Sequence, residues 1–365
     1  MVDLNALLQK KSFSKEDLML FLSLKDDEAK KLLNKALEVK LREIGNKVYL
    51  RGLIEYSNVC RKNCYYCGVR LSNNNVCRYS LSNEEVLDCA KRAMQLNYGS
   101  IAIQCGERQD RNFIENINTL IKQIKKLSNN SLGITLSCGE QEKEVYEKWF
   151  SSGAHRYLLR IETTNEELFY KIHPKDEKHS FQKRIRAIED LIEIGYQTGT
   201  GVMIGLPFQE DEDLANDLLF FKKMNVAMVG MGPFIPHNET PLYKYKDIIL
   251  SDRQRLNKTL NMIASLRLLM PKINMVAATA DQSISEKGRE EAVLAGANII
   301  MPNLTPRKYR ENYSIYPNKA SLGDIPIEGE NSLDKRMLSI NHSIGYGFWG
   351  DSKAYTTQNE YKARQ

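Results

Sequence analysis

The sequence has 365 residues, of which 42% are hydrophobic and 27% are charged, and its formal net charge is +6. A chain of this length can bury a large core in one to three domains. Its 52 basic residues are interspersed with 46 acidic ones and form no dense basic block, which disfavours a nucleic-acid-binding role. No apolar stretch approaches the roughly 20 residues of a membrane span, and the first residues lack a secretory signal. We therefore expect a protein of the reducing cytoplasm.

Residues 1–45 carry apolar side chains at helical spacing. Ser14 is predicted to cap one helix, with Asp17 in its first turn, and a second helix is predicted over residues 26–41. We interpret this segment as an N-terminal helical extension that covers a larger domain.

A predicted strand over residues 48–57 leads directly into a loop that holds three cysteines, Cys60, Cys64 and Cys67. Their C-x₃-C-x₂-C spacing suits three corners of one 4Fe–4S cluster, whose usual ligands are cysteine thiolates. The loop has no fourth cysteine, so one iron would stay open to another ligand. A structural zinc site would need four ligands, and no second C-x₂-C or histidine pair lies nearby. Disulfides are disfavoured in an odd-numbered set of seven cysteines without a secretory signal.

From residue 48 onward, apolar strand-like segments alternate with amphipathic helical ones. The predicted strands span 48–57, 100–104, 132–137, 155–161, 197–204, 226–231, 273–278 and 297–301. The predicted helices span 82–97, 110–127, 141–152, 180–194, 210–224, 251–269 and 286–295. Such alternation favours an α/β fold with a parallel sheet, and eight strands favour a closed (β/α)₈ TIM-type barrel with its site at the C-terminal strand ends. An open or partial barrel stays possible. We place the barrel domain at 46–320 and a tail that packs on it at 321–365.

Polar residues follow several of the predicted strands. Gln104, Gly106 and Glu107 follow the second, Thr135 ends the third, and Arg160 and Glu162 end the fourth. A glycine at position 106 lets the backbone approach a ligand closely. The run Gly199-Thr-Gly201-Val-Met-Ile-Gly205 is not a dinucleotide fingerprint, because its spacing differs and it lies within a strand.

The remaining cysteines and histidines give weaker signals. Cys77, Cys89 and Cys138 are interpreted as unpaired, partly buried thiols, whereas Cys105 follows the second strand and is a candidate to face the site. His237 is either a ligand or proton donor, or a loop residue that caps backbone groups, and we favour the second interpretation.

The cysteine loop, with an aromatic residue at position 66, resembles the signature of the radical S-adenosylmethionine (SAM) superfamily. Four segments together resemble the HydE family of that superfamily: Asn58–Arg70, Arg160-Ile-Glu-Thr163, Met228–His237 and Ile300-Met-Pro-Asn303. The resemblance implies an enzyme that binds one 4Fe–4S cluster through Cys60, Cys64 and Cys67. It also implies that SAM chelates the open iron and is cleaved reductively to a 5′-deoxyadenosyl radical.

The resemblance also assigns expected roles to other residues. Tyr66 would border the adenine, Gly106 and Glu107 the methionine amino group, and Glu162 and Arg184 the ribose and carboxylate. Arg160 would pair with Glu162 or with a substrate carboxylate, which an arginine fork suits. The residues that match positions lining a substrate cavity are Gln104, Thr135, Thr279, Met301, Tyr313 and Tyr316. Met228 is a further candidate from its predicted place in the barrel interior, with core packing as the alternative. Tyr313 and Tyr316 have an alternative role, which is to pack the tail against the barrel.

For HydE-like proteins the implied substrate is a cysteine-bound Fe(CO)₂(CN) unit used in assembling the active-site cluster of FeFe hydrogenases. The implied partners are a one-electron donor such as ferredoxin or flavodoxin and the other hydrogenase maturases, a radical SAM partner and a GTPase scaffold. Two alternatives stay open: an amino-acid rearrangement of the methylornithine synthase type, and a non-catalytic iron–sulfur carrier. No cysteine follows Cys138, which excludes the second, C-terminal cluster of some relatives, and Ala278 stands where relatives often have threonine.

Overall fold

Eight parallel strands form the centre of the fold in this computed structural model, which describes residues 3–319 and 332–356. They are β1 (Lys47–Ser57), β2 (Ser100–Cys105), β3 (Gly133–Ser137), β4 (Arg156–Leu158), β5 (Gln197–Thr200), β7 (Met228–Gly230), β9 (Asn274–Val276) and β10 (Ile299–Ile300). Each strand pairs in parallel with the next, and β10 pairs with β1 at Tyr49↔Ile299, which closes the sheet. The predicted closed (β/α)₈ barrel is confirmed, and the open or partial barrel is excluded.

The strand predicted over residues 197–204 is interrupted in the structure. β5 ends at Thr200, and residues 203–204 form a separate short strand, β6 (Met203–Ile204), which pairs with β8 (Gly232–Pro233). The backbone of Gly201 lies so close to that of Gly230 that a Cβ at position 201 would be 1.9 Å from the Gly230 carbonyl oxygen. The prediction of one continuous strand was therefore wrong, because the chain leaves the barrel ladder where these two glycines meet.

The seven predicted amphipathic helices are all present around the barrel. They are α4 (Asn83–Gln95), α5 (Arg111–Leu127), α6 (Lys143–Ser151), α8 (Phe181–Ile194), α9 (Asp211–Met224), α10 (Asp252–Leu269) and α12 (Gly288–Ala295). Short helices that the periodicity did not predict are α7 (Glu166–Ile172), α11 (Thr279–Ile284), η1 (Pro241–Tyr245), α13 (Arg307–Arg310) and α14 (Leu333–Leu338). Segments of four to seven residues hold at most two helical turns, which is too short to reveal a period.

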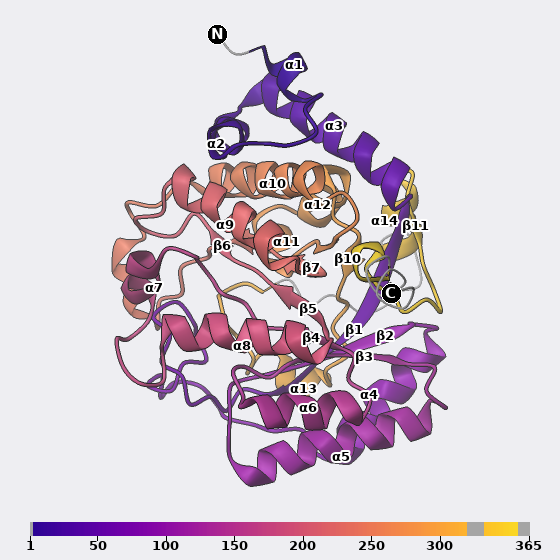
Figure 1. Cartoon of the computed structure of the whole chain (residues 1–365). Coiled ribbons are helices and arrows are strands. Elements are labelled where there is room, and N and C mark those ends of the chain that lie inside the picture. The colour runs from indigo at the N-terminus through magenta and orange to yellow at the C-terminus, as the bar shows by residue number, and fades with distance from the viewer. Residues whose placement is uncertain (1–2, 320–331, 357–365) are drawn as a thin grey trace.

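Three helices precede the barrel: α1 (Leu4–Leu7), α2 (Lys15–Ser23) and α3 (Asp26–Glu43). Ser14 caps α2 as predicted, and Asp17 in the first turn completes a capping box with it. Figure 1 shows these helices stacked outside the barrel helices, where α2 packs on α9 and α3 on α10 and α12. The boundaries given above for the three parts of the chain stay predictions.

The described part of the tail packs on the N-terminal end of the barrel. Strand β11 (Ser343–Ile344) pairs with the start of β1. Beyond it, the Trp349 carbonyl accepts hydrogen bonds from Ser100 and Arg156 at the starts of β2 and β4. The prediction of a tail packed on the barrel also covers residues 320–331 and 357–365, which lie outside the described residues. Within the described ranges, no helix is long and apolar enough to cross a membrane.

Candidate functional site

The three cysteines of the C-x₃-C-x₂-C motif lie in the loop that follows β1, at the C-terminal end of the barrel. The Cys60 sulfur accepts backbone N–H groups of Lys62 at 3.4 Å and of Glu107 at 3.3 Å. The Cys67 N–H donates to the Cys64 carbonyl at 3.3 Å. The loop is thereby folded on itself and bound to the segment that follows β2.

Burial raises the pKa of all three thiols, and the charges of neighbouring cysteines raise the pKa of Cys64 and Cys67 further. The pKa of Cys67 rises to about 12, through burial and then the nearby Cys60. Thiolates at these positions therefore need a bound cationic partner. Among the described residues, no three histidine, cysteine or carboxylate side chains are arranged to hold a single metal ion. A four-iron cube instead binds its cysteines at separate corners, and this set of partly buried thiols fits that donor requirement.

Gly106 packs against the cysteine loop. A Cβ at this position would be 2.4 Å from the Val59 carbonyl oxygen and 2.7 Å from the Cys60 Cβ. The Gly106 N–H also donates to the Ser57 carbonyl at 2.8 Å. The close neighbour of this glycine in the structure is the chain's own cysteine loop, and its expected place beside the amino group of a ligand stays a prediction.

Two buried histidines hold the loop from its other side. The Tyr66 hydroxyl is 3.2 Å from His173 Nε2, and the two rings meet edge to face with centroids 5.3 Å apart. His179 Nε2 accepts the Asn63 N–H at 2.9 Å, while its Nδ1 is 2.7 Å from Asp176. Both histidines are buried contacts of the cysteine loop, and the sequence analysis did not single out either as a site residue.

Four buried charged side chains form a network beside the loop. Lys62 Nζ donates to Glu140 Oε2 at 2.8 Å and lies 3.4 Å from Glu107 Oε1, and Arg184 Nε donates to Glu140 Oε1. Burial raises the pKa of Glu107. Burial also acts to raise the pKa of Glu140, but the Arg184 and Lys62 charges outweigh it and lower that pKa. Glu107 and Arg184 were predicted site residues, whereas Lys62 and Glu140 were missed, since nothing in their spacing marks them.

Arg160 and Glu162 pair with each other at the end of β4. The Arg160 Nε and Nη2 donate to the Glu162 carboxylate at 2.9 to 3.0 Å, and Arg160 Nη1 donates to the Gly230 carbonyl at 3.0 Å. Glu162 has a left-handed backbone, with φ of 69°. A residue other than glycine is strained in this backbone conformation, and such strained residues are frequent in functional sites.

The residues predicted to line the barrel interior lie at different depths. Gln104 is level with Glu55 and Ser137 near the top of β2 and stays partly accessible. Thr135 accepts a hydrogen bond from Arg156 at 3.0 Å, which places it with the N-terminal strand ends. Met228 packs with Met301 and contacts Arg51. The structure thus places Gln104 near the C-terminal strand ends, where the cysteine loop lies. Thr135 and Met228 lie deeper in the barrel.

Residues 312–319 lie against the cysteine loop. The Gly68 N–H donates to the Ile315 carbonyl at 2.9 Å, and the Asn58 amide donates to the Asn312 carbonyl at 2.7 Å. Tyr313 and Tyr316 belong to this segment, and Tyr313 is buried. Lys319 reaches into the barrel and pairs with Glu55, a buried ion pair that the sequence did not predict. Thr279 begins α11, and its hydroxyl accepts a hydrogen bond from Arg289 at 3.0 Å.

Two weaker candidates have other surroundings. Cys105 is buried in the main hydrophobic core together with Cys138, and burial raises the pKa of its thiol well above the usual value. His237 Nδ1 accepts the Glu239 N–H at 3.1 Å, and its carbonyl accepts from Thr240. His237 therefore caps backbone groups, as the favoured interpretation had it.

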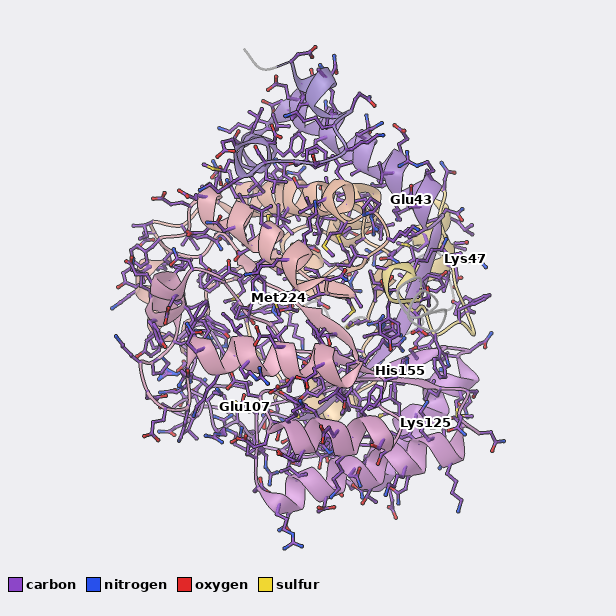
Figure 2. The ribbon with its side chains drawn as sticks, in the orientation of Figure 1. Glu43, Lys47, Glu107, Lys125, His155 and Met224 are labelled. Atoms are coloured by element: carbon purple, nitrogen blue, oxygen red, sulfur yellow. The ribbon has the colours of Figure 1, made fainter. Side chains whose placement is uncertain are left out.

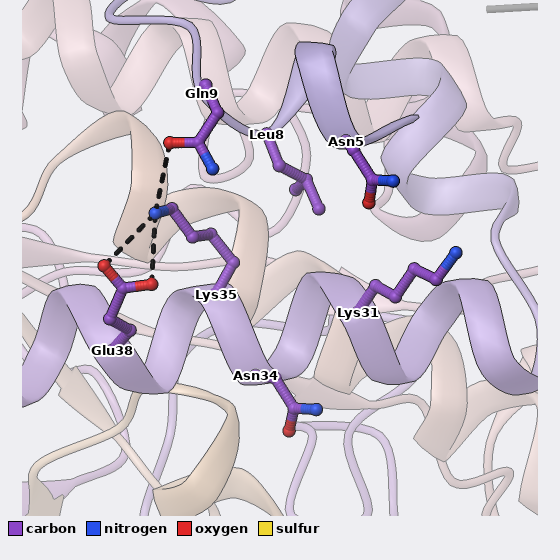
Figure 3. Close-up of a pocket in the computed structure, with 7 residues that line it drawn as sticks. All are labelled: Asn5, Leu8, Gln9, Lys31, Asn34, Lys35 and Glu38. Atoms are coloured by element: carbon purple, nitrogen blue, oxygen red, sulfur yellow. Dashed lines mark hydrogen bonds and ion pairs between the residues drawn. The ribbon is translucent and has the colours of Figure 1, made fainter. Parts of the chain in front are cut away.

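The site occupies one end of the barrel. Figure 2 shows Glu107, which follows β2, at the opposite end from Lys47 and His155, which lie at the starts of β1 and β4. A surface pocket lies elsewhere, between the first helix and α3, where Lys35 hydrogen-bonds Gln9 and Glu38 (Figure 3). Its polar, open lining holds none of the predicted site residues.

Comparisons with known proteins agree with this geometry. Residues 54–221 match the radical SAM superfamily. The chain is 43% identical over 352 residues to the [FeFe] hydrogenase maturase subunit HydE of Thermotoga maritima, covering 96% of this chain and 97% of the relative. It is 28% identical over 326 residues to 3-methylornithine synthase of Methanosarcina acetivorans, covering 89% and 88%. The crystal structure of methylornithine synthase (PylB) has a TM-score of 0.76 at 22% identity and covers 99% of both chains, which shows the shared fold.

The barrel, the three-cysteine loop and the superfamily match define a radical SAM enzyme, a class that implies a 4Fe–4S cluster and SAM. Within that class, the identity to a HydE protein over nearly the whole of both chains decides the family. The chain belongs to the HydE family, whose role lies in FeFe-hydrogenase maturation.

Proposed function

We propose that this protein binds one 4Fe–4S cluster through Cys60, Cys64 and Cys67 and acts with SAM on a cysteine-bound Fe(CO)₂(CN) precursor during assembly of the hydrogenase active-site cluster. One observation carries the proposal. A partly buried three-thiol loop stands beside a buried charge network that keeps one carboxylate oxygen without a hydrogen-bond donor, in a chain 43% identical to HydE along its length.

The residues around the loop fit the two charged ends of SAM. Glu107 Oε1 is buried without a hydrogen-bond donor, so it suits the amino group of SAM. Arg184 is already oriented by Glu140 and suits the carboxylate, and Tyr66 is fixed by His173 and suits the adenine. When bound, the cluster and SAM supply reductive cleavage of the sulfonium and so a 5′-deoxyadenosyl radical.

The paired Arg160 and Glu162 form the wall next to this region. Because two nitrogens of Arg160 donate hydrogen bonds to the Glu162 carboxylate, the carboxylate is held in one orientation for the ribose hydroxyls. We propose that the substrate lies below SAM, toward Gln104 and Met301. The other proposed lining residues are Thr135, Met228, Thr279, Tyr313 and Tyr316.

Reduction of the cluster requires a one-electron donor such as ferredoxin or flavodoxin, and the product would pass to the other maturases, including the GTPase scaffold. Amino-acid rearrangement of the methylornithine synthase type is the second candidate, favoured by the similarity to 3-methylornithine synthase over 89% of the chain. The two candidate functions differ in substrate: the first acts on an iron complex, and the second on an organic amino acid.

Anaerobic SAM cleavage by the reconstituted protein tests the shared part of the proposal. Cys64→Ala should abolish both stoichiometric iron loading and 5′-deoxyadenosine formation, while Cys77→Ala, at an exposed thiol outside the motif, should leave both intact. Cleavage that survives Cys64→Ala would refute the radical SAM mechanism for this chain.

A further inference from the structure

Lys62 is an unusual residue to find inside the cysteine loop. It lies between Cys60 and Cys64, and only 4% of its side chain is exposed. Lysine is almost never fully buried unless its charge is paired. Its Nζ donates to Glu140 Oε2 at 2.8 Å and to the Lys178 carbonyl, so it bonds two groups outside its own loop.

The two oxygens of Glu107 differ in what surrounds them. Oε2 accepts the Glu140 N–H at 2.9 Å. Oε1 is buried and has no hydrogen bond, although Lys62 Nζ lies 3.4 Å away and Arg61 Nε 4.0 Å away. A buried carboxylate oxygen without a donor is costly, so its persistence indicates a position that a ligand's donor completes.

The network is balanced in charge before any ligand arrives. Lys62 and Arg184 are cations, Glu107 and Glu140 are anions, and Arg184 is committed to Glu140 and to the Arg160 carbonyl. Among the described residues, only Lys62 lies within ion-pair distance of both carboxylates. Without it, Glu107 and Glu140 would repel each other, and Glu107 would lose the nearest charge that fixes its position.

We infer that Lys62 is a positioning residue for the amino end of SAM: it holds Glu107 and Glu140 from within the cysteine loop and leaves Glu107 Oε1 free to accept the ammonium. The inference rests on the proposed function, because it takes SAM to be the ligand. Lys62 would thus couple the geometry of the cluster loop to that of the amino subsite. A purely structural lysine, pinning the loop to Lys178, would instead affect cluster loading alone.

Equilibrium binding to the anaerobically reconstituted, unreduced protein separates these roles. Three probes differ at the methionyl end: SAM, decarboxylated SAM, which keeps the amino group, and 5′-methylthioadenosine, which has neither charged group. Lys62→Met should retain full iron content, bind SAM and decarboxylated SAM about ten-fold or more weakly, and bind methylthioadenosine unchanged. Lys62→Arg should recover part of the loss, and Lys175→Met, at an exposed lysine nearby, should change nothing.

Other outcomes overturn the inference. Unchanged SAM affinity in Lys62→Met would show that Lys62 does not position Glu107 for SAM binding. An equal loss for all three probes, or a loss that follows the iron content, would show a structural role only. If the unmodified protein binds its cluster but not SAM, the proposed function fails, and the inference fails with it.

Discussion

At the scale of single residues, buried polar groups hold the segments of the site in place. The turn after β4 is an example: the Asp217 Oδ1 accepts the N–H of Thr164 at 2.7 Å and its hydroxyl at 2.6 Å, directly beyond Glu162. The other oxygen of Asp217 is buried without a hydrogen bond. Burial raises the pKa of this carboxyl to about 7, against the opposing effect of Thr164.

This raised pKa predicts a stability that falls with rising pH. The folded state binds the Asp217 proton more tightly than the unfolded state, so the contribution is complete below the usual pKa near 3.8 and is lost as pH rises through about 7. Asp217→Asn keeps the acceptor for Thr164 and removes the charge. Urea unfolding should therefore find that the stability advantage of the variant over the unmodified protein grows from pH 5 to pH 8, by about 2 to 3 kcal/mol. An equal difference at both pH values would contradict this assignment.

At the scale of elements, the cysteine loop depends on the segment after β2 for its shape. The Cys60 sulfur, the Val59 carbonyl and the backbone of residues 106–107 lie in direct contact. Because the nearest atoms are backbone and a Cβ, they cannot yield to a larger residue as a flexible side chain would. The loop and the strand end thus form one packed unit.

Gly106→Ala is accordingly predicted to displace the cysteine loop. Iron bound per chain after anaerobic reconstitution should fall to less than half, because the new methyl group would overlap Val59 and Cys60. Gly45→Ala is the matched control: its φ is +82° but no atom lies within 4 Å of the added Cβ, so it should cost about 1 kcal/mol of stability and leave iron binding unchanged. Full iron loading in Gly106→Ala would contradict the packing argument.

The sequence predicted the elements unevenly, for physical reasons. The barrel strands could be predicted from their short apolar runs, because they are buried on both faces. The seven longer helices could be predicted from their periodicity, because an amphipathic helix buries one repeating set of side chains. The break after Thr200 did not, because it arises from contact between Gly201 and Gly230, which are 29 positions apart. Cys60, Cys64 and Cys67 could be predicted since their spacing carries the chemistry, whereas Lys62, Glu140 and the Glu55–Lys319 pair become visible only when distant segments meet.

At the scale of the whole molecule, the tail ties the N-terminal end of the barrel together. The buried Arg156 hydrogen-bonds Thr135, Ser100, Trp349 and Asp351, and so joins three strands to the tail. Asp351 provides the carboxylate for this cation and also lies 3.3 Å from His155. The opposite, C-terminal end is thereby left to the site.

Asp351→Asn should destabilise the barrel by about 2 to 3 kcal/mol, because it leaves the Arg156 charge buried without its counterion, although Asp351 itself is partly exposed. Thermal unfolding should show a midpoint lowered by several degrees. Asp88→Asn, at an exposed ion pair with Lys91, should change stability by less than about 0.5 kcal/mol. Equal effects of the two substitutions would show that the tail contributes little to the stability of the barrel.

The central claim is that this member of the HydE family uses SAM on an iron complex. Its most direct test is 5′-deoxyadenosine formation by the reconstituted, reduced protein, with and without the cysteine-bound Fe(CO)₂(CN) complex, followed by rapid-freeze EPR. We predict cleavage stimulated by the complex and an EPR signal from an iron-coupled adenosyl adduct. Vigorous SAM cleavage at a rate that does not depend on the complex would contradict the claim and favour an organic substrate. Amino acids would then be tested first.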